Sequence, residues 1–104
     1  MEIPAFLDRT ARLMGKDAVA RLLNAKVAVF GLGGVGSYAA EALARSGVGA
    51  LVLVDGDDIE ESNLNRQLFA LRSTIGMPKA LAAKERIAQI NPDCAVEAKK
   101  LFYL

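Results

Sequence analysis

The sequence predicts one α/β domain, with a parallel sheet flanked by helices. Two short apolar runs, residues 26–30 (KVAVF) and 50–54 (ALVLV), indicate buried strands, and segments with helical spacing alternate with them. Such alternation favours a parallel sheet with right-handed crossovers. A glycine-rich turn directly follows the first run, and ligands of these sheets bind at the carboxyl ends of the strands.

The composition limits the classes of function. The 104 residues are enough for about one small domain, and 53% hydrophobic with 24% charged residues indicates a globular chain. A net charge of +1 gives no overall field that favours nucleic acid or membranes. The chain has no histidine and one cysteine, Cys94, which excludes histidine chemistry and a disulfide framework within these residues. We expect Cys94 to be a small buried residue.

The N-terminus carries no pattern of a secretory signal. Asp8, Arg9 and Arg12 stand where such a signal needs an apolar core. The apolar run around residues 48–54 is far shorter than the ~18–20 residues of a membrane helix. We therefore expect a cytoplasmic location and no membrane segment.

The first half of the chain predicts helix, strand, helix and strand. Residues 16–24 have apolar side chains at helical spacing, and Asp17 near the start suits the helix dipole. Residues 37–45 are rich in alanine and leucine and are followed by Gly47, a helix end signal. The run 50–54 does not alternate, which indicates a parallel strand covered on both faces.

The second half predicts a long loop, a helix and a third strand. Residues 56–77 are polar and irregular, and a connection of that length in a compact domain is usually functional. Pro78 opens a helix that runs to about Ile90, where Asn91 and Pro92 end it. We expect a strand over residues 95–103, with Phe102 and Tyr103 in the strand and the core. The complete order is one mononucleotide-binding half of a Rossmann-like fold, preceded by an N-terminal helix.

The first strand of this topology lies inside the complete sheet. Here the chain ends before a fourth strand could cover it, so Val27 and Val29 would form a bare apolar edge. We therefore expect residues 1–104 to be one nucleotide-binding domain that is truncated at its C-terminus. The alternative is a small complete domain that dimerises through this edge.

The glycine turn has the spacing of a nucleotide-binding motif. Gly31 allows the tight turn, Gly33 and Gly34 let backbone N–H groups approach a phosphate, and Gly36 permits close packing of helix on strand. Asp55 ends the second strand about twenty residues later and is placed to accept hydrogen bonds from ribose. The alternative is a plain strand–helix corner. The turn alone does not separate NAD or FAD from ATP.

Polar residues after the second strand favour a phosphate ligand. Arg66 offers directional donors to a phosphate, and Asn63 and Gln67 can hydrogen-bond phosphate or ribose. Lys79 adds a second cation at the start of the following helix, where it opposes the helix dipole. That local cost indicates that Lys79 serves a ligand. The alternative is a solvated loop with ordinary surface charges.

Four stretches together resemble a known family: GLGGVGS, LVDGDDIEESNLNRQ, TIGMPKA and RIAQINP. They are similar to the ThiF/MoeB-type adenylating superfamily, which includes the ubiquitin-activating enzymes, from about Phe6 to Tyr103. The branch that the spelling most resembles is that of the tRNA threonylcarbamoyladenosine dehydratases. The resemblance implies that ATP and Mg²⁺ are bound and that a carboxylate is adenylated with release of pyrophosphate. In that branch the carboxylate belongs to a modified adenosine of tRNA, and a ring closes with net loss of water.

The resemblance also assigns site residues. It implies that the phosphate turn consists of Gly31, Gly33, Gly34 and Gly36, that Asp55 is the ribose ligand and that Asp57 is a further acid near the nucleotide. It also implies that the phosphate is contacted by Asn63, Arg66 and Lys79, and that Gln67 completes the motif. Arg9 stands where the superfamily often sends an arginine into the partner's ATP site, so we expect a homodimer, with Arg66, Lys79 and Arg9 serving the chemistry. The magnesium-binding aspartate is expected beyond Leu104, so we expect no metal ligand here and an inactive isolated chain.

Three other functions remain open at this stage. One is an activating enzyme for a ubiquitin-like sulfur-carrier protein, which would bring a sulfur-transfer partner. Another is an NAD- or FAD-binding oxidoreductase half, against which Asn63, Arg66 and Gln67 argue. The last is a scaffold that keeps the fold without catalysis. A tRNA partner is implied by the resemblance alone, because the basic residues form no stripe with interleaved aromatics.

Overall fold

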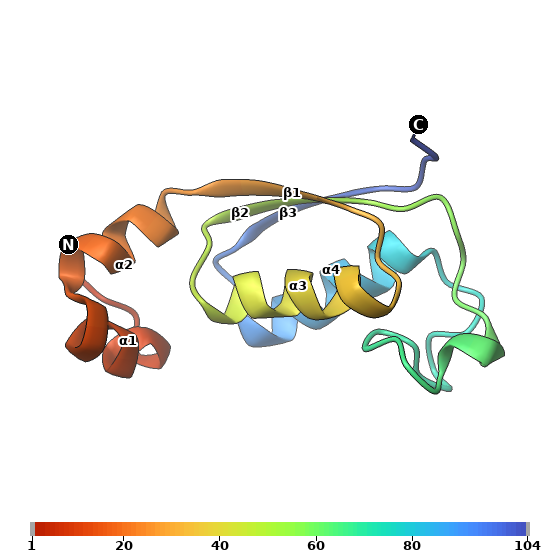
Figure 1. Cartoon of the computed structure of the whole chain (residues 1–104), viewed down its shortest axis with the longest axis horizontal. Coiled ribbons are helices and arrows are strands. Elements are labelled where there is room, and N and C mark those ends of the chain that lie inside the picture. Colours follow the sequence, from red (N-terminus) through yellow and green to blue (C-terminus); the bar gives the residue numbers. More distant parts are fainter. Residues whose placement is uncertain (1, 104) are drawn as a thin grey trace.

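A parallel three-stranded sheet organises the chain, and the computed structural model describes residues 2–103 (Figure 1). The strands are β1 (Lys26–Phe30), β2 (Ala50–Val54) and β3 (Ala95–Lys99), in the order β1-β2-β3. The helices are α1 (Asp8–Met14), α2 (Lys16–Leu23), α3 (Gly34–Arg45) and α4 (Lys79–Ile90), with short 3₁₀ turns η1 (Ala5–Leu7) and η2 (Glu61–Asn63). The expected α/β class, with parallel strands and flanking helices, is confirmed.

The core lies between one face of the sheet and the helices α3 and α4, which run side by side beneath it (Figure 1). Leu51 and Leu53 on this face are fully buried, because strand side chains alternate between faces. Val52 points the other way and is only half-buried, beside exposed Ala28. The expectation that β2 is covered on both faces was wrong, since both crossover helices among the described residues lie on the same side.

The N-terminal part contains one more helix than expected. The helix predicted over 16–24 is present as α2, but α1 precedes it, and Gly15 separates the two with a φ of 91°. An ion pair of 3.1 Å between Arg12 and Asp8 spans one turn of α1. Leu7 is buried so closely over Gly47 that a Cβ there would lie 2.6 Å from its Cδ1. Because Gly47 precedes β2, this part of the chain lies at the amino-terminal end of the sheet.

The third strand is shorter than predicted and ends at Lys99. The Leu101 N–H donates to the Lys99 carbonyl at 3.2 Å and turns the chain away. Phe102 and Tyr103, expected in the strand and core, are instead 78% and 47% exposed. The Tyr103 ring meets the Phe30 ring edge-on, with centroids 5.3 Å apart.

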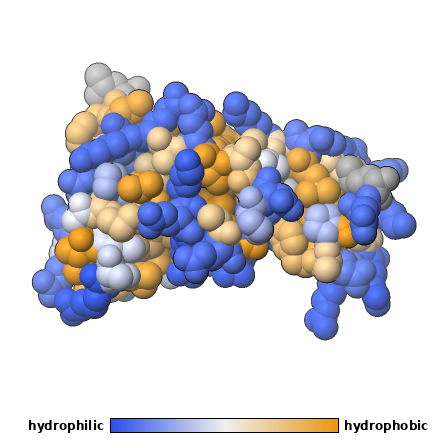
Figure 2. Space-filling view, turned by 180° about the vertical axis from the view of Figure 1, so that it is seen from behind, coloured by the Kyte–Doolittle hydropathy of each residue, from blue (hydrophilic) through white to orange (hydrophobic). Residues whose placement is uncertain are grey.

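The side of the molecule opposite to that in Figure 1 is a mosaic of hydrophobic and hydrophilic patches (Figure 2). Of the helices that the structure describes, none combines the length and apolar character needed to cross a membrane.

Candidate functional site

Asp55 joins the glycine turn to the loop that follows β2. One carboxylate oxygen accepts the Leu32 N–H at 2.7 Å, and the other accepts the Asp57 N–H at 2.8 Å. The residue is only 7% exposed, so these bonds fix both backbone segments at the carboxyl ends of β1 and β2. A carboxylate has about four lone-pair sites, so capacity remains for ribose hydroxyls.

The glycine turn is compact because the backbone at Gly36 packs directly against the backbone at Gly31. Gly31 has a φ of 90°, and a Cβ on Gly36 would lie 1.7 Å from the Gly31 carbonyl oxygen. The helix α3 begins at Gly34, three residues before its predicted start, and the Ser37 N–H bonds to the Gly33 carbonyl at 3.1 Å. The preceding N–H groups of the first turn have no partner inside the helix, as in the anion-binding ends of other helices.

The long loop of residues 56–77 is closed at its base, where its two ends meet. The Ile59 N–H donates to the Met77 carbonyl at 2.8 Å, and the Lys79 N–H donates to the Asp57 carbonyl at 3.0 Å. Asp58 and Pro78 form an antiparallel bridge between these bonds. The pairing brings the first residue of α4 beside the end of β2.

A polar pocket of about 210 Å³ opens at this junction. Its lining contains five residues that the sequence singled out, Asp57, Asn63, Arg66, Gln67 and Lys79. It also contains Asp58 and Glu60, which sequence reasoning missed, although the acidic run DGDDIEE was a signal for them.

The pocket residues are held by local bonds. Asn63, Gln67 and Lys79 are 6–8% exposed, and the Asn63 side-chain oxygen accepts the Glu60 N–H at 2.8 Å. The Gln67 side-chain nitrogen lies 3.9 Å from where a Cβ on Gly33 would be, so the pocket adjoins the glycine turn.

Arg66 is exposed and is anchored through one end of its guanidinium. Its Nη1 donates to the Ser62 carbonyl at 3.0 Å and to the Asn65 side chain at 2.9 Å. A guanidinium has five N–H donors, so most of them remain available at the pocket rim.

Arg9 is not brought to this site within its own chain. It is exposed on α1, which lies at the amino-terminal end of the sheet (Figure 1). The pocket residues instead follow the carboxyl end of β2.

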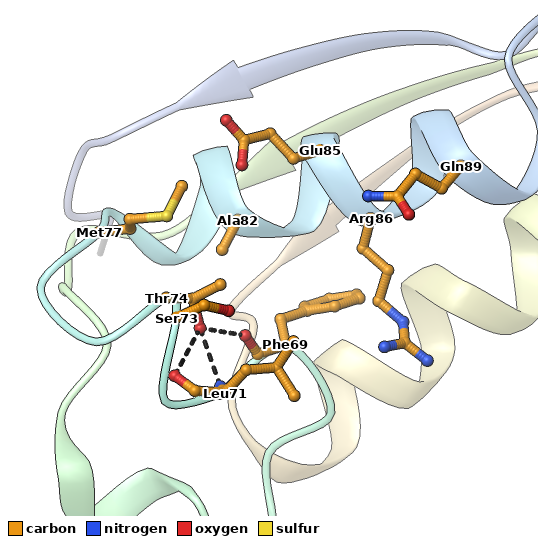
Figure 3. A pocket seen from close by; sticks show the side chains of 9 residues that line it. All are labelled: Phe69, Leu71, Ser73, Thr74, Met77, Ala82, Glu85, Arg86 and Gln89. Atoms are coloured by element: carbon orange, nitrogen blue, oxygen red, sulfur yellow. Dashed lines mark hydrogen bonds between the residues drawn. The ribbon is translucent and has the colours of Figure 1, made fainter.

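A larger hollow of about 310 Å³ lies between the loop and α4 and contains none of the predicted site residues (Figure 3). The Thr74 hydroxyl in it is used by its own loop, donating to the Phe69 carbonyl at 2.8 Å. Cys94 is half-buried rather than fully buried as expected. Burial raises the pKa of its thiol, which does not suit a nucleophile.

The glycine turn, the strand-end carboxylate and the polar pocket beside them are together typical of a Rossmann-like fold. The pattern of the ThiF family matches residues 7–102, and the chain belongs to this family.

The similar proteins include tRNA threonylcarbamoyladenosine dehydratases and an adenylyltransferase of a sulfur carrier protein. A tRNA threonylcarbamoyladenosine dehydratase of Bacillus subtilis is 58% identical over 95 residues, which are 91% of this chain and 37% of the relative. The crystal structure of the Escherichia coli dehydratase TcdA in complex with ATP is 46% identical, with a TM-score of 0.92 over 98% of this chain and 44% of that one. An E. coli sulfur carrier protein ThiS adenylyltransferase is 44% identical over 82 residues, 79% of this chain and 33% of the relative. The chain thus spans little more than a third of the curated dehydratase that it matches.

Proposed function

We propose that the protein carrying this chain uses ATP to adenylate a carboxylate, and that residues 1–104 form its ATP-binding domain. The observation that carries the proposal is the placement of Arg66 and Lys79 in one pocket beside the glycine turn. A hydride-transferring domain has no evident need for two cations beyond its ribose carboxylate. An enzyme that expels pyrophosphate does, because negative charge moves onto the leaving phosphates.

In this proposal each part of the site has one task. The N–H groups in the first turn of α3 bind phosphate, which can approach closely because Gly33 and Gly34 have no side chain. Asp55 accepts hydrogen bonds from ribose. Asn63 and Gln67 orient the nucleotide, and Asp57 lies near it. Arg66 and Lys79 stabilise the charge that develops as the carboxylate attacks the α-phosphate and pyrophosphate leaves.

The proposed carboxylate is that of the threonylcarbamoyl group on a modified adenosine of tRNA. The support is the dehydratase relative at 58% identity. Adenylation turns the carboxylate oxygen into a leaving group, and attack from within the same group closes a ring and releases AMP. The net change to the tRNA is loss of water. A tRNA substrate also favours a cytoplasmic location.

Magnesium is expected to accompany ATP, but the described residues do not form its site alone. No group of three or more acidic, histidine or cysteine side chains among residues 2–103 is placed to hold a metal.

We further propose a homodimer in which Arg9 of one chain serves the other chain's site. Arg9 lies on an exposed helix at the far end of the sheet from its own pocket, so any role at such a pocket requires a second copy.

The second candidate is adenylation of the C-terminus of a ubiquitin-like sulfur-carrier protein, with a sulfur-transfer partner. It is favoured by the ThiS adenylyltransferase relative at 44% identity. The same pocket chemistry would serve it, so the two candidates differ in the substrate and not in the nucleotide.

The test combines nucleotide binding with isotope exchange in the full-length protein. Calorimetry should give binding of ATP and none of NAD or FAD. Arg66→Ala should slow carboxylate-dependent ATP–pyrophosphate exchange by roughly 100-fold, because one transition-state donor is lost. Modified tRNA, and not a sulfur-carrier protein, should support the exchange.

Arg72→Ala is the matched control. Arg72 is an exposed arginine of the same loop that pairs with Glu61 at 2.9 Å and does not line the polar pocket. Its loss should change the exchange rate by less than about twofold. Undiminished exchange in Arg66→Ala would remove the role assigned to Arg66, and preferential binding of NAD or FAD would overturn the function itself.

A further inference from the structure

Two helices begin at the proposed nucleotide site. The helix α3 starts inside the glycine turn at Gly34, and α4 starts at Lys79. They run side by side beneath the same face of the sheet (Figure 1). Their relative position therefore sets the distance between the N–H groups of the turn and the ammonium of Lys79.

Small side chains dominate the buried faces of the two helices. Ala40 and Ala44 of α3 and Ala80 and Ala83 of α4 are at most 1% exposed. Alanines form shallow ridges, so packing alone fixes the position of one helix along the other weakly.

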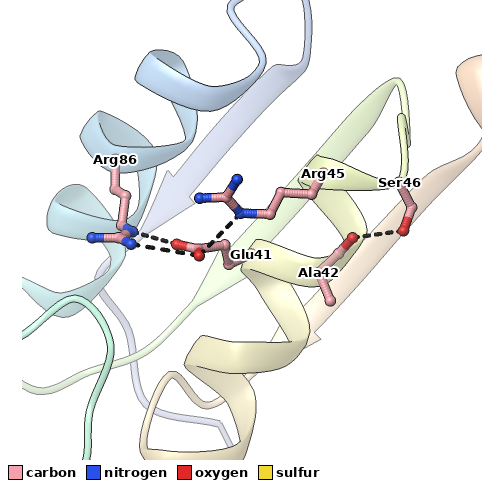
Figure 4. A network of polar contacts seen from close by, with 5 residues as sticks. All are labelled: Glu41, Ala42, Arg45, Ser46 and Arg86. Atoms are coloured by element: carbon pink, nitrogen blue, oxygen red, sulfur yellow. Dashed lines mark hydrogen bonds and ion pairs between the residues drawn. The ribbon is translucent and has the colours of Figure 1, made fainter. Parts of the chain in front are cut away.

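Glu41 links the two helices from the C-terminal half of α3 (Figure 4). Its Oε1 accepts the Nε–H of Arg86, and its Oε2 accepts Arg86 Nη2 at 3.4 Å and Arg45 Nε at 3.1 Å. Burial acts to raise the pKa of Glu41, but the hydrogen bonds and charges of Arg86 and Arg45 outweigh it and hold the pKa below its usual value. The carboxylate is therefore ionised and accepts from both arginines.

Two other polar contacts hold α3 in place, and unlike those of Glu41 they are bonds between a side chain and the backbone. The Ser37 hydroxyl accepts the Leu68 N–H at 3.3 Å, and the Asn91 side chain donates to the Ala44 carbonyl at 3.2 Å. Leu68 belongs to the loop before α4, whereas Asn91 directly follows α4 and ties its C-terminal end to that of α3. Among the described residues, the Glu41–Arg86 contact is the only hydrogen bond between side chains of the two helices.

We propose that Glu41 and Arg86 are positioning residues for ATP: their contact holds α3 against α4 and so sets the glycine turn at its working distance from Lys79. The inference rests on the proposed function, because it concerns the same nucleotide site. Neither side chain lines the polar pocket, so both act through the helices that carry the pocket residues.

The experiment measures ATP affinity by calorimetry in the full-length protein and in three glutamine variants. Glu41→Gln and Arg86→Gln should each weaken ATP binding by about tenfold, since displacements of ~1 Å are costly in a preorganised site. The double variant should bind no more weakly than either single variant, because both changes remove one contact.

Arg45→Gln is the control. Arg45 bonds to the same carboxylate oxygen but belongs to α3, so it does not tie the two helices. Its loss should leave ATP affinity unchanged within about twofold. All affinities are measured well below each variant's melting temperature. If Arg86→Gln does not fold, Arg86→Lys replaces it and should also weaken ATP binding, because its ammonium cannot reproduce the two-nitrogen contact with the carboxylate.

Equal ATP affinity in all folded variants, with lowered melting temperatures, would reduce the pair to a structural role and overturn the inference. Equal weakening by Arg45→Gln would also overturn it, because loss of charge and not the link between helices would then matter. An unaltered protein that binds no ATP would overturn the proposed function together with this inference.

Discussion

At the scale of single residues, Lys79 lowers the stability of the fold at its position, and nothing in the folding of the chain requires a cation there. It is 8% exposed and is the first residue of α4, where its positive charge opposes the helix dipole. Among the described residues the structure gives it no ion pair. A buried cation that opposes the local field is stabilised when an anionic ligand arrives, which is the role proposed for it.

Replacing Lys79 should therefore separate stability from binding. Lys79→Met keeps most of the side-chain volume and should raise the free energy of unfolding by up to about 1 kcal/mol, as the dipole conflict is removed. ATP affinity should fall by at least about tenfold, because a charge-assisted bond to phosphate is lost. Urea unfolding and calorimetry measure the two quantities.

Lys84→Met is the comparison, since Lys84 is exposed further along the same helix. It should alter neither quantity appreciably. Unchanged ATP affinity in Lys79→Met would mean that Lys79 does not contact the nucleotide.

At the scale of elements, the strands were the most predictable part. β1 and β2 match their predicted bounds, because Gly31 directly follows the first apolar run and Gly49 directly precedes the second. The end of β3 was not predictable from its own residues, because Phe102 and Tyr103 have high strand propensity. What ends β3 is its partner: Val54 pairs with Lys99, and from Asp55 onward β2 gives way to the loop.

Five residues that the sequence singles out line one pocket, but the geometry of that pocket could not be predicted. The motif predicts Asp55 as a ribose ligand, but no sequence pattern indicates that its two oxygens also hold the turn and the loop. The pocket depends on pairing between residues 57–59 and 76–79, which are too far apart in sequence for local patterns to reveal. Glu41 was passed over because a charged residue on a helix usually faces solvent.

In the glycine turn, the same substitution of glycine by alanine should have very different effects on stability at two neighbouring positions. Gly36→Ala would place a Cβ 1.7 Å from the Gly31 carbonyl oxygen, so the turn must open. We expect a loss of about 3 kcal/mol in the free energy of unfolding, as in severe overpacking. Gly34→Ala meets no atom within 4 Å and should stay within about 1 kcal/mol of the original stability. Urea unfolding compares the variants, and equal losses at both positions would contradict the close crossing of the backbone.

At the scale of the whole molecule, the residues proposed to serve one site lie at opposite ends of the sheet. The carboxyl end holds the pocket with Arg66 and Lys79, and the amino end presents the exposed Arg9 on α1. On the same N-terminal segment Leu13 is 86% exposed. A two-fold dimer can bring the amino end of each chain to the carboxyl end of the other, which forms two equivalent composite sites.

Mixing two inactive variants of the full-length protein tests this assembly. Arg9→Ala and Arg66→Ala should each lose most exchange activity alone, because every site in either homodimer lacks one arginine. In a fully exchanged mixture half of the dimers are mixed and one of their two sites is intact, so about a quarter of the original activity should return.

Arg12→Ala, on the same helix and paired with Asp8, is the control and should stay active. Mass measurement of differently tagged chains confirms that mixed dimers form. If they form without restoring activity, Arg9 does not act across the dimer. If Arg9→Ala alone is fully active, the helix α1 has no part in the chemistry.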